Sequence, residues 1–304
     1  MNEQKKQMAE AAILYYKKNY TQQEIANVMG LTRQTVSKLL GDAVKENVVE
    51  IKIHNPLEDC KILEEKICKK FNINKVIVCS VSKDIKELRM QMVVQQASKY
   101  LSSVLSQGSL KIGVSWGRTV SAVISEFSYI KTKGNIVFPL FGATDSEESC
   151  FLSNEQARNL AEKTGAEAKY AWFPYRPDNE EDCNLLKKTS YYNKMCDLWS
   201  DIDVAIVGIG NKTMLRIFEK TFGVSENNGH AIGDIATHFF DKSGKILPLY
   251  HNTLCASDEN LKNAKKTVAI ACGDDKVSAI KGALKTGLVD VLITDEYTAR
   301  QLGE

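Results

Sequence analysis

The sequence has little of several features that define whole classes of protein. Its longest apolar run, from Ala11 to Tyr16, is far too short to cross a bilayer, and no basic-then-apolar leader opens the chain. The 40 basic side chains are balanced by 38 acidic ones, so the formal charge of +2 gives no overall attraction to nucleic acid. Repeats and low-complexity tracts are also missing. These absences predict a soluble, cytoplasmic globular protein and exclude a disordered or fibrous chain.

Metal-binding and disulfide patterns are missing as well. The eight cysteines are irregularly spaced and none belongs to a Cys-x-x-Cys pair, which favours reduced thiols over disulfides or a zinc site. Histidine is scarce, and His230 and His238 are better explained as ordinary surface or core residues than as metal ligands. We therefore expect no metal and no cofactor.

What the sequence does contain is two regions with different patterns, and 304 residues are enough for about two domains. Residues 1–56 have the pattern of a small helical unit that closes at Pro56. Residues 57–304 alternate apolar strands with helices, which predicts a mostly parallel sheet covered on both faces and hence an α/β domain. The strands are expected at residues 76–81, 110–114, 136–140, 168–173, 204–209, 267–271 and 289–294, and the main helices at 57–71, 86–105, 154–163, 183–199 and 277–284.

Within the small unit, a first helix over residues 8–18 is expected to bury Met8, Ala11, Ala12 and Tyr15, which have helical spacing. Thr21-Gln22-Gln23-Glu24 is a capping box that opens a second helix ending at Gly30. Thr32 then caps a third helix that runs to about residue 46. The alternating residues 49–53 predict a short strand.

The second and third helices have the residue pattern of a helix-turn-helix. Glycine falls at the turn, where a left-handed backbone is needed, and a small alanine falls where the helices cross. Five further positions must be apolar for the helices to pack. The residues that meet these requirements are Gly30, Ala26, Ile25, Met29, Leu31, Val36 and Leu39.

The third helix keeps a polar face that packing does not explain. Residues of these types donate hydrogen bonds to phosphates and pair with base edges in the major groove. We expect Arg33, Gln34 and Ser37 to read bases and Thr35 and Lys38, beside Thr32, to hold the DNA backbone. Residues 1–56 carry eight basic and six acidic side chains, which is the whole charge excess of the protein. A unit so weakly cationic needs two or more copies on a palindromic operator.

In the α/β region four polar segments are expected in loops at strand ends, where open α/β sheets bind ligands. Each segment alone is more often a turn or a helix cap, and none matches the Walker or dinucleotide glycine fingerprint. Together they offer amides and a lysine for a phosphate and carboxylates for sugar hydroxyls. Their candidate effector-binding residues are Ser115, Gly117, Arg118 and Thr119, then Gly142, Ala143 and Thr144, then Asp234, and last Lys276.

These motifs resemble one family in the order in which they occur. A helix-turn-helix followed by GVSWGRT, FPLFGAT, NEQARNLAEKTGA, GDI with FFD, ACGDDKVSAIKGAL and VLITDEYTA is similar to the SorC-type bacterial sugar-responsive transcriptional regulators. The resemblance implies an effector domain like the sugar-phosphate isomerase fold of glucosamine-6-phosphate deaminase. It further implies a phosphorylated sugar or polyol as effector, operator DNA as partner and a homo-oligomer, commonly a tetramer.

The resemblance also implies roles for single residues. Ser115, Gly117 and Thr119 would lie in the ligand cleft opposite Gly142 and Thr144, Asp234 would bind hydroxyls and Lys276 the phosphate. Two departures matter. Many relatives have glycine where this chain has Ala143, and relatives that respond to deoxyribose phosphate have an imine-forming lysine where this chain has Phe141. A covalently bound aldehyde effector is therefore disfavoured.

A rival interpretation is an isomerase-like or deaminase-like enzyme with an attached DNA-binding domain. Asp145, Asp234, Asp274 and Asp295 have the chemistry of a general base, but a binding protein needs the same carboxylates. An enzyme gains nothing evident from a helix-turn-helix, so we expect a regulator, most simply a repressor, and no enzyme. The helix at residues 57–71 is the expected connector. Trp172 is expected in the core, and the role of Arg176 stays open.

Overall fold

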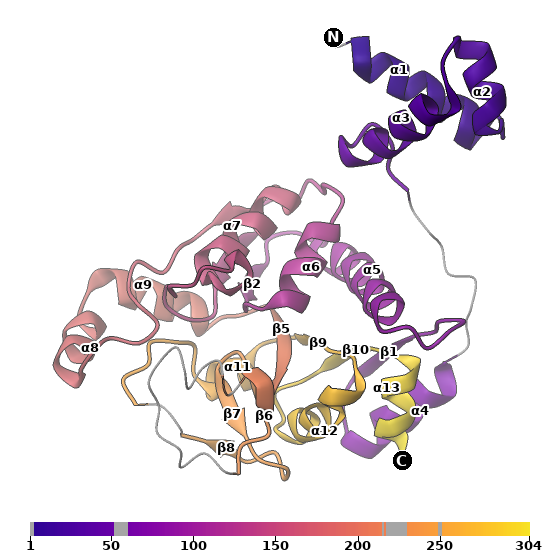
Figure 1. Ribbon diagram of the computed structural model, residues 1–304. Helices are drawn as coiled ribbons and strands as arrows, with labels where there is room; N and C mark the ends of the chain where they lie inside the picture. The colour runs from indigo at the N-terminus through magenta and orange to yellow at the C-terminus, as the bar shows by residue number, and fades with distance from the viewer. Residues whose placement is uncertain (1–2, 52–59, 215, 217–229, 249–250) are drawn as a thin grey trace. The chain divides into compact units, whose positions relative to one another are not determined.

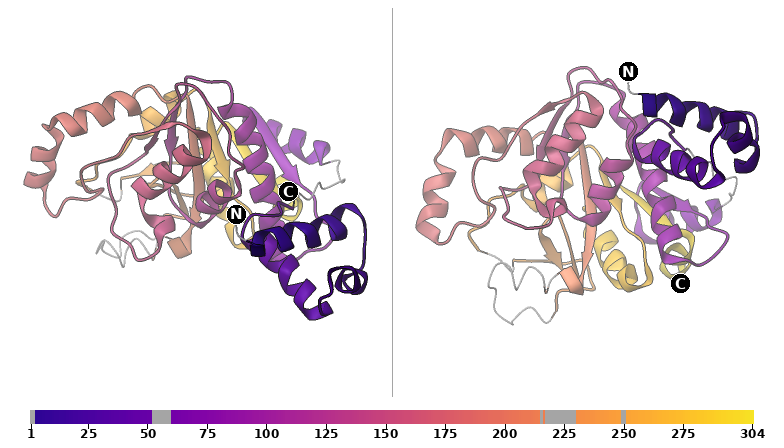
Figure 2. Two further views of the ribbon diagram at one scale, coloured as in Figure 1. Left: turned by 90° about the horizontal axis from the view of Figure 1, so that it is seen from above. Right: turned by 45° about the horizontal axis from the view of Figure 1, so that its top comes forward.

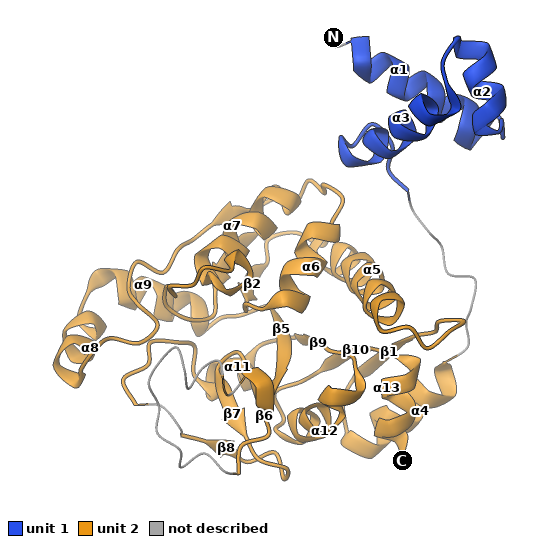
Figure 3. Cartoon of the chain, in the orientation of Figure 1, with its two compact units in different colours: residues 1–56 blue, residues 57–304 orange. Residues whose placement is uncertain are grey.

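The computed structural model describes residues 3–51, 60–214, 216, 230–248 and 251–304. The chain separates into two compact units, residues 1–56 and residues 57–304, which Figure 3 shows in blue and orange. Among the described residues, buried apolar side chains form one cluster in the first unit and two clusters in the second. Each unit therefore has a hydrophobic core of its own.

The first unit is a small helical domain with the expected helix-turn-helix. Thr21 and Glu24 form the predicted capping box, and Gly30 ends the second helix with a left-handed φ of 65°. Ile25, Ala26, Val36 and Leu39 are buried, while Met29 and Leu31 pack partly buried against them. The elements are α1 (Glu3–Ala12), the π-helical turn η1 (Ile13–Lys17), α2 (Gln22–Met29) and α3 (Arg33–Lys45).

Two expectations for this unit were wrong. Tyr15 is exposed rather than buried, because the helix widens into η1 from Ile13 onward and Leu14 packs against the core instead. Residues 49–51 form no strand. The amides of Val48 and Val49 both donate to the carbonyl of Ala43, so the chain folds back on α3. Residues 52–53 of the expected strand lie outside the described residues.

The second unit is built on a sheet whose long path is parallel throughout. Its strand order is β1-β10-β9-β5-β2-β3-β4, and an antiparallel extension runs from β5 through β6 and β7 to β8. The strands are β1 (Lys75–Cys79), β2 (Lys111–Val114), β3 (Ile136–Pro139), β4 (Glu167–Ala168), β5 (Val204–Asn211), β6 (Gly233–Ile235), β7 (His238–Phe240), β8 (Ile246–Leu247), β9 (Thr267–Ile270) and β10 (Val291–Asp295).

Helices cover both faces of this sheet, as expected for continuous apolar strands. Figure 1 shows α5, α6 and α7 on one face and α4, α12 and α13 on the other, and the two core clusters fill these two layers. Figure 2 shows the same layers from two further directions. The helices are α4 (Lys61–Phe71), α5 (Lys86–Leu105), α6 (Arg118–Glu126), α7 (Ser153–Thr164), α8 (Glu180–Lys187), α9 (Ser190–Trp199), α11 (Asp258–Asn263), α12 (Val277–Lys285) and α13 (Glu296–Gly303), with short turns η2 (Ser149–Phe151) and η3 (Asp274–Lys276).

The fold corrects four expectations for the second unit. The strand expected at residues 168–173 is only β4, because the side chain of Asn154 takes the backbone bonds of Ala171. The helix expected at 183–199 is two helices, since Thr189 caps α9. Trp172 is 67% exposed instead of buried and touches Tyr170 edge to face. The helix expected at 57–71 begins at Lys61, residues 57–59 lying outside the described part.

The strand order places a topological switch between β2 and β5. The chain runs from β2 outward through β3 to β4 on one side, and from β5 through β9 to β10 on the other. Ligands of open α/β sheets bind in the crevice outside the carboxyl ends of the strands at this point. The segments that follow β2, β3, β5 and β9 are therefore the places to examine for a binding site.

Candidate functional site

The first unit presents the polar face of α3 as an exposed surface. Six side chains lie exposed on it, none of them covered by the unit's own core. The Thr32 hydroxyl accepts a hydrogen bond from the amide of Thr35 at 3.1 Å, and the two threonine hydroxyls lie 2.8 Å apart. The cap therefore fixes the start of the helix and leaves the rest of the face free for a partner. The six are Thr32, Arg33, Gln34, Thr35, Ser37 and Lys38.

The segment after β2 has the features of an anion site. Gly117 has a φ of 113°, which favours glycine, and nothing lies within 4 Å of the place where a Cβ would be. No side chain caps α6, so its first-turn amides keep their donor capacity for a ligand. The hydroxyls of Ser115 and Thr119 are nearly buried beside it. Arg118 is exposed and forms a two-pronged ion pair with Glu148, at 3.0 and 3.2 Å.

The segment after β3 lies at the same edge, but its polar groups are already used. The amides of Gly142 and Ala143 donate to backbone carbonyls at 2.8 and 2.7 Å. The Thr144 hydroxyl donates to the carbonyl of Phe151. A Cβ on Gly142 would meet the backbone of Pro174 at 2.6 Å, so close chain packing explains this glycine. The segment is better suited to forming a wall than to donating to a ligand.

We expected Asp234 in a loop, but it lies in the middle of strand β6. It pairs with Gly210 at the end of β5, where a Cβ on the glycine would come within 1.9 Å of the aspartate Oδ1. The carboxylate accepts a hydrogen bond from the amide of Thr237 at 3.3 Å and is 5% exposed. The antiparallel extension from β5 thus carries this carboxylate to the switch point.

The segment after β9 carries Lys276 and is held in place by hydrogen bonds to other elements. Asp274 accepts from the guanidinium of Arg89 at 3.0 Å and from Gln301 at 3.0 Å. Asp275 accepts from the amide nitrogen of Asn211 at 2.8 Å. Both aspartates therefore position the loop, and the cation at its end is the group left to meet a ligand.

Arg89 and Asn211, which bind the two aspartates of the Lys276 loop, were missed by sequence reasoning. Arg89 lies within α5, remote in sequence from every polar segment, and is only 4% exposed. It also lies 2.8 Å from the fully buried Asp295, which caps α13. An arginine in an otherwise amphipathic helix was the available signal, because a buried arginine needs partners.

Burial shifts the pKa values of Asp234 and Lys276 in opposite directions. Burial raises the pKa of Asp234 to about 6, and the Thr237 amide and the nearby charge of Lys276 offset part of that rise. Burial likewise lowers the pKa of Lys276, against the favourable charges of Asp275 and Asp234 among others. Asp234 pairs with the end of β5, and Lys276 follows β9, the neighbouring strand, so a carboxylate and a cation at this edge can bind hydroxyls and an anionic group of one ligand.

The raised pKa of Asp234 predicts how stability depends on pH. The folded carboxyl keeps its proton up to about pH 6, whereas the unfolded one loses it near 4, so stability falls as pH rises between them. We expect a loss of about 3 kcal/mol over this window. In urea unfolding at pH 4 to 7, Asp234→Asn should lack this fall. Asp241→Asn is the control, because hydrogen bonds from Ser243 lower that pKa; an unchanged fall in Asp234→Asn would contradict the assignment.

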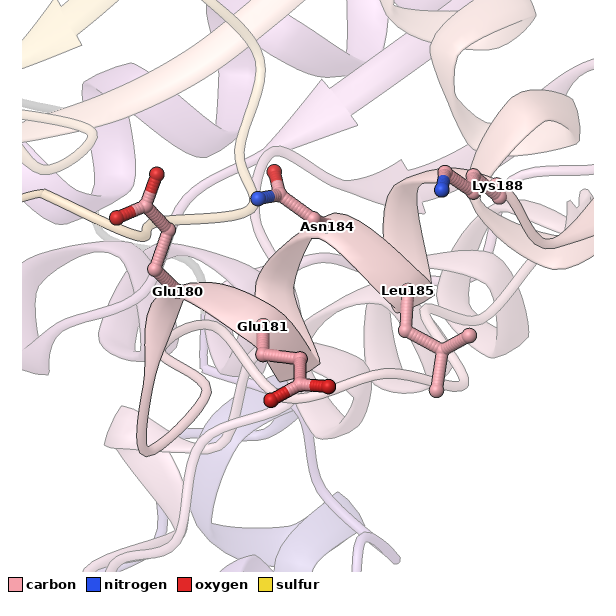
Figure 4. Close-up of a pocket in the computed structure, with 5 residues that line it drawn as sticks. All are labelled: Glu180, Glu181, Asn184, Leu185 and Lys188. Carbon is pink, nitrogen blue, oxygen red and sulfur yellow. The ribbon is translucent and has the colours of Figure 1, made fainter.

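A hollow elsewhere on the second unit does not have this chemistry. It has a volume of about 540 Å³ and lies along α8, and Figure 4 shows Glu180, Asn184 and Lys188 on one side of the helix with Glu181 and Leu185 on the next. All of its lining residues come from α8 and the residue that follows it, so it is a depression along the surface of one helix. The eight cysteines are free of disulfides. Within the described ranges no cluster of His, Cys, Asp and Glu could hold a metal, and no helix is both long and apolar enough to span a membrane.

Known proteins match both units. The family model of the sugar-binding domain, Sugar-bind, matches residues 55–302, and the model of sigma-70 region 4 matches residues 9–46. These two matches define a class: a helix-turn-helix unit followed by a sugar-binding domain. Within that class, the chain belongs to the SorC-type family of sugar-binding transcriptional regulators.

Individual relatives are similar to this chain over nearly their full length. The chain is 28% identical to the sorbitol operon regulator of Klebsiella pneumoniae, covering 96% of this chain and 95% of that protein. It is 28% identical to the deoxyribonucleoside regulator of Bacillus subtilis, covering 99% of each. The crystal structure of full-length SorC from Klebsiella pneumoniae aligns over 100% of both chains, with a TM-score of 0.74 and 26% identity. The predicted fold class is therefore confirmed, and so is the function as a sugar-responsive DNA-binding regulator.

Proposed function

We propose that this regulator represses a carbohydrate-utilisation operon and that a phosphorylated sugar or polyol changes its binding to operator DNA. One observation carries the proposal: Asp234, which pairs with the end of β5, and Lys276, which ends the turn after the neighbouring strand β9, lie at the same edge of the sheet. A relative named as a sorbitol operon regulator supports a polyol or sugar as the effector. We further propose that the protein acts in the cytoplasm, in keeping with its function as a DNA-binding regulator.

In this proposal Lys276 binds the effector phosphate and Asp234 binds its hydroxyls. The buried hydroxyls of Ser115 and Thr119 and the open space at Gly117 support a ligand position beside α6. Arg118 can leave Glu148 at little cost, because that ion pair is exposed. The remaining residues form the opposite wall, namely Gly142, Ala143 and Thr144.

Coupling between effector and operator requires that the effector favour one quaternary state. We propose a homo-oligomer, commonly a tetramer in this family, whose paired helix-turn-helix units bind a palindromic operator. The helix α4 is the proposed connector, since it follows the boundary between the two units. If the effector is an inducer, operator binding must weaken effector binding by the same factor. No cofactor or metal enters this scheme.

The alternative is a sugar-phosphate isomerase-like or deaminase-like enzyme with an attached DNA-binding domain. The observation that favours it is the pKa of Asp234, about 6, which suits a general base. Other carboxylates at this edge are engaged, Asp274 and Asp295 by Arg89 and Asp275 by Asn211. We therefore propose binding without catalysis. If phosphorus NMR detected conversion of a bound sugar phosphate into a product, the protein would be an enzyme.

The proposal is tested by combining two measurements on the full chain. A thermal-shift screen against phosphorylated sugars and polyols, with their unphosphorylated forms as matched controls, should yield hits among the phosphorylated compounds alone. A gel shift with the duplex selected by the protein from a random library should then change on adding such a hit. Stabilisation by the unphosphorylated form to the same extent would refute the phosphate requirement.

Arg33→Ala is expected to weaken operator binding and to relax base preference at one position. A bidentate arginine–guanine contact is worth about 1–3 kcal/mol, which is roughly 5- to 150-fold in affinity. The exposed Lys45 at the end of α3 offers a matched control, Lys45→Ala, that removes the same charge away from the predicted face. Affinity and base preference unchanged in Arg33→Ala would show that Arg33 reads no base.

A further inference from the structure

The turn that precedes the helix-turn-helix presents three tyrosines to solvent. Tyr15, Tyr16 and Tyr20 are 37%, 44% and 41% exposed. Tyr15 and Tyr16 lie on η1, and their rings meet edge to face with 4.9 Å between centroids. Short π-helical segments are rare and occur frequently at functional sites. Phenol groups gathered on such a segment suit a partner surface, because each ring combines a rigid body with a hydrogen-bonding tip.

The backbone holds this turn in one shape. The amide of Lys18 donates to the carbonyl of Ile13 at 3.1 Å, and the amide of Tyr20 donates to the carbonyl of Leu14 at 3.0 Å. Asn19 between them adopts a left-handed φ of 56°, which asparagine tolerates well. Leu14 anchors the turn in the core of the unit. The tyrosines are therefore presented on a fixed frame.

The three tyrosines line a hollow of about 680 Å³ together with residues of the helix-turn-helix. We call this hollow the tyrosine seat. Its lining combines tyrosine rings with polar side chains, and the one charged member among these described residues is the cation of Arg33. The full lining is Tyr15, Tyr16, Asn19, Tyr20, Thr21, Gln22, Gln23 and Arg33.

Charge distinguishes the tyrosine seat from two other hollows of the described residues. The hollow on α8 is lined by Glu180 and Glu181, and one between α1 and α2 by Glu3 and Glu10. Glu24 is not part of the lining, but its carboxylate accepts from the amide and the hydroxyl of Thr21, which is, at 2.8 and 2.9 Å, so the donors left to the seat are those of the tyrosines, the glutamines, Asn19 and Arg33. The seat therefore offers donors and positive charge without a carboxylate on its wall, which is the complement of a phosphate group.

We propose that the tyrosine seat binds a phosphodiester of the operator backbone beside the base pairs that α3 reads. The tyrosine hydroxyls donate to the phosphate oxygens, and Arg33, which lies at the first position of α3 and also lines the seat, joins the backbone contact to the base-reading face. The seat fixes the register of the recognition helix without reading sequence. This inference rests on the function as a DNA-binding regulator.

The test compares full-length variants on the duplex that the wild-type chain selects from a random-sequence library. Tyr15→Phe, Tyr16→Phe and Tyr20→Phe combined remove only hydroxyls, and at about fivefold per hydroxyl we expect affinity to fall about 100-fold. The fall should be equal on selected and on scrambled duplex. Tyr129→Phe with Tyr191→Phe removes exposed hydroxyls from the second unit and should change nothing.

A scan of single methylphosphonate substitutions locates the contact. Wild type should lose affinity at one backbone position per half-site that the triple variant no longer distinguishes. An unchanged affinity, or a triple variant that keeps the wild-type methylphosphonate profile, would overturn the tyrosine seat while leaving DNA binding intact. Failure of the wild-type chain to enrich any duplex would instead refute DNA binding itself.

A second variant separates binding from folding. Gln22→Glu puts a carboxylate in the seat at the first position of α2, where negative charge stabilises a helix. A phosphate seat therefore predicts an unchanged or higher melting temperature with at least tenfold weaker DNA binding. Binding retained at wild-type strength would overturn the proposal.

Discussion

Replacing Lys276 by alanine is expected to abolish the response to the effector and to leave operator affinity unchanged. Lys276 ends a loop that is fixed through Asp274 and Asp275, and burial keeps its ammonium poorly hydrated. A charged hydrogen bond to phosphate is then worth about 2–3 kcal/mol, roughly 30- to 150-fold in effector affinity. Calorimetric titration with the effector and a gel shift on the selected duplex measure the two properties separately.

Lys281→Ala is the matched control for this experiment. Lys281 lies on α12, the helix that begins directly after Lys276, so its removal changes the net charge equally without touching the proposed phosphate position. The melting temperature of Lys276→Ala should stay near that of wild type, because a buried ammonium costs solvation energy that alanine does not. A normal effector response in Lys276→Ala would exclude the phosphate role.

The helix-turn-helix could be predicted almost completely from sequence because its requirements are local. A capping box, a left-handed glycine and six packing positions all fall within 20 residues, and each constrains the next. The preceding helix could not be predicted in the same way. A π-helical turn at Ile13 shifts every later side chain around the axis, and no propensity distinguishes Tyr15 from Leu14 as the buried residue.

The strand ends could be predicted, but the contacts between them could not. Glycine and polar residues after apolar runs indicated the segments at Gly117 and Lys276 correctly as loop and helix start. The place of Asp234 depends on an antiparallel extension from β5, whose strands are two or three residues long and have no detectable alternation. The partners of Arg89 could not be predicted, because Asp274 and Asp295 lie about 200 residues away from it in the sequence.

The largest loss of stability is expected from Arg89→Ala. Arg89 is 4% exposed and binds Asp84, Asp274 and the fully buried Asp295 at 2.8–3.0 Å. Its burial opposes the charge, yet hydrogen bonds to Asp274 and Asp84 and the charge of Asp295 hold its pKa above the usual value. Removing it strands Asp295 as an uncompensated buried charge, at a cost of about 3–5 kcal/mol. Urea unfolding of the second unit measures this loss.

A double variant distinguishes the contribution of Arg89 to stability from its effect on effector binding. In Arg89→Met with Asp295→Asn, both buried charges disappear, so most of the lost stability should return. Asp274, however, still lacks its guanidinium, and only Gln301 then holds the first aspartate of the Lys276 loop. We therefore expect stability near wild type but effector affinity reduced severalfold, with DNA binding unaffected. Recovery of both stability and effector affinity would show that Arg89 only stabilises the core. The Lys276 loop would then keep its position without the contact from α5.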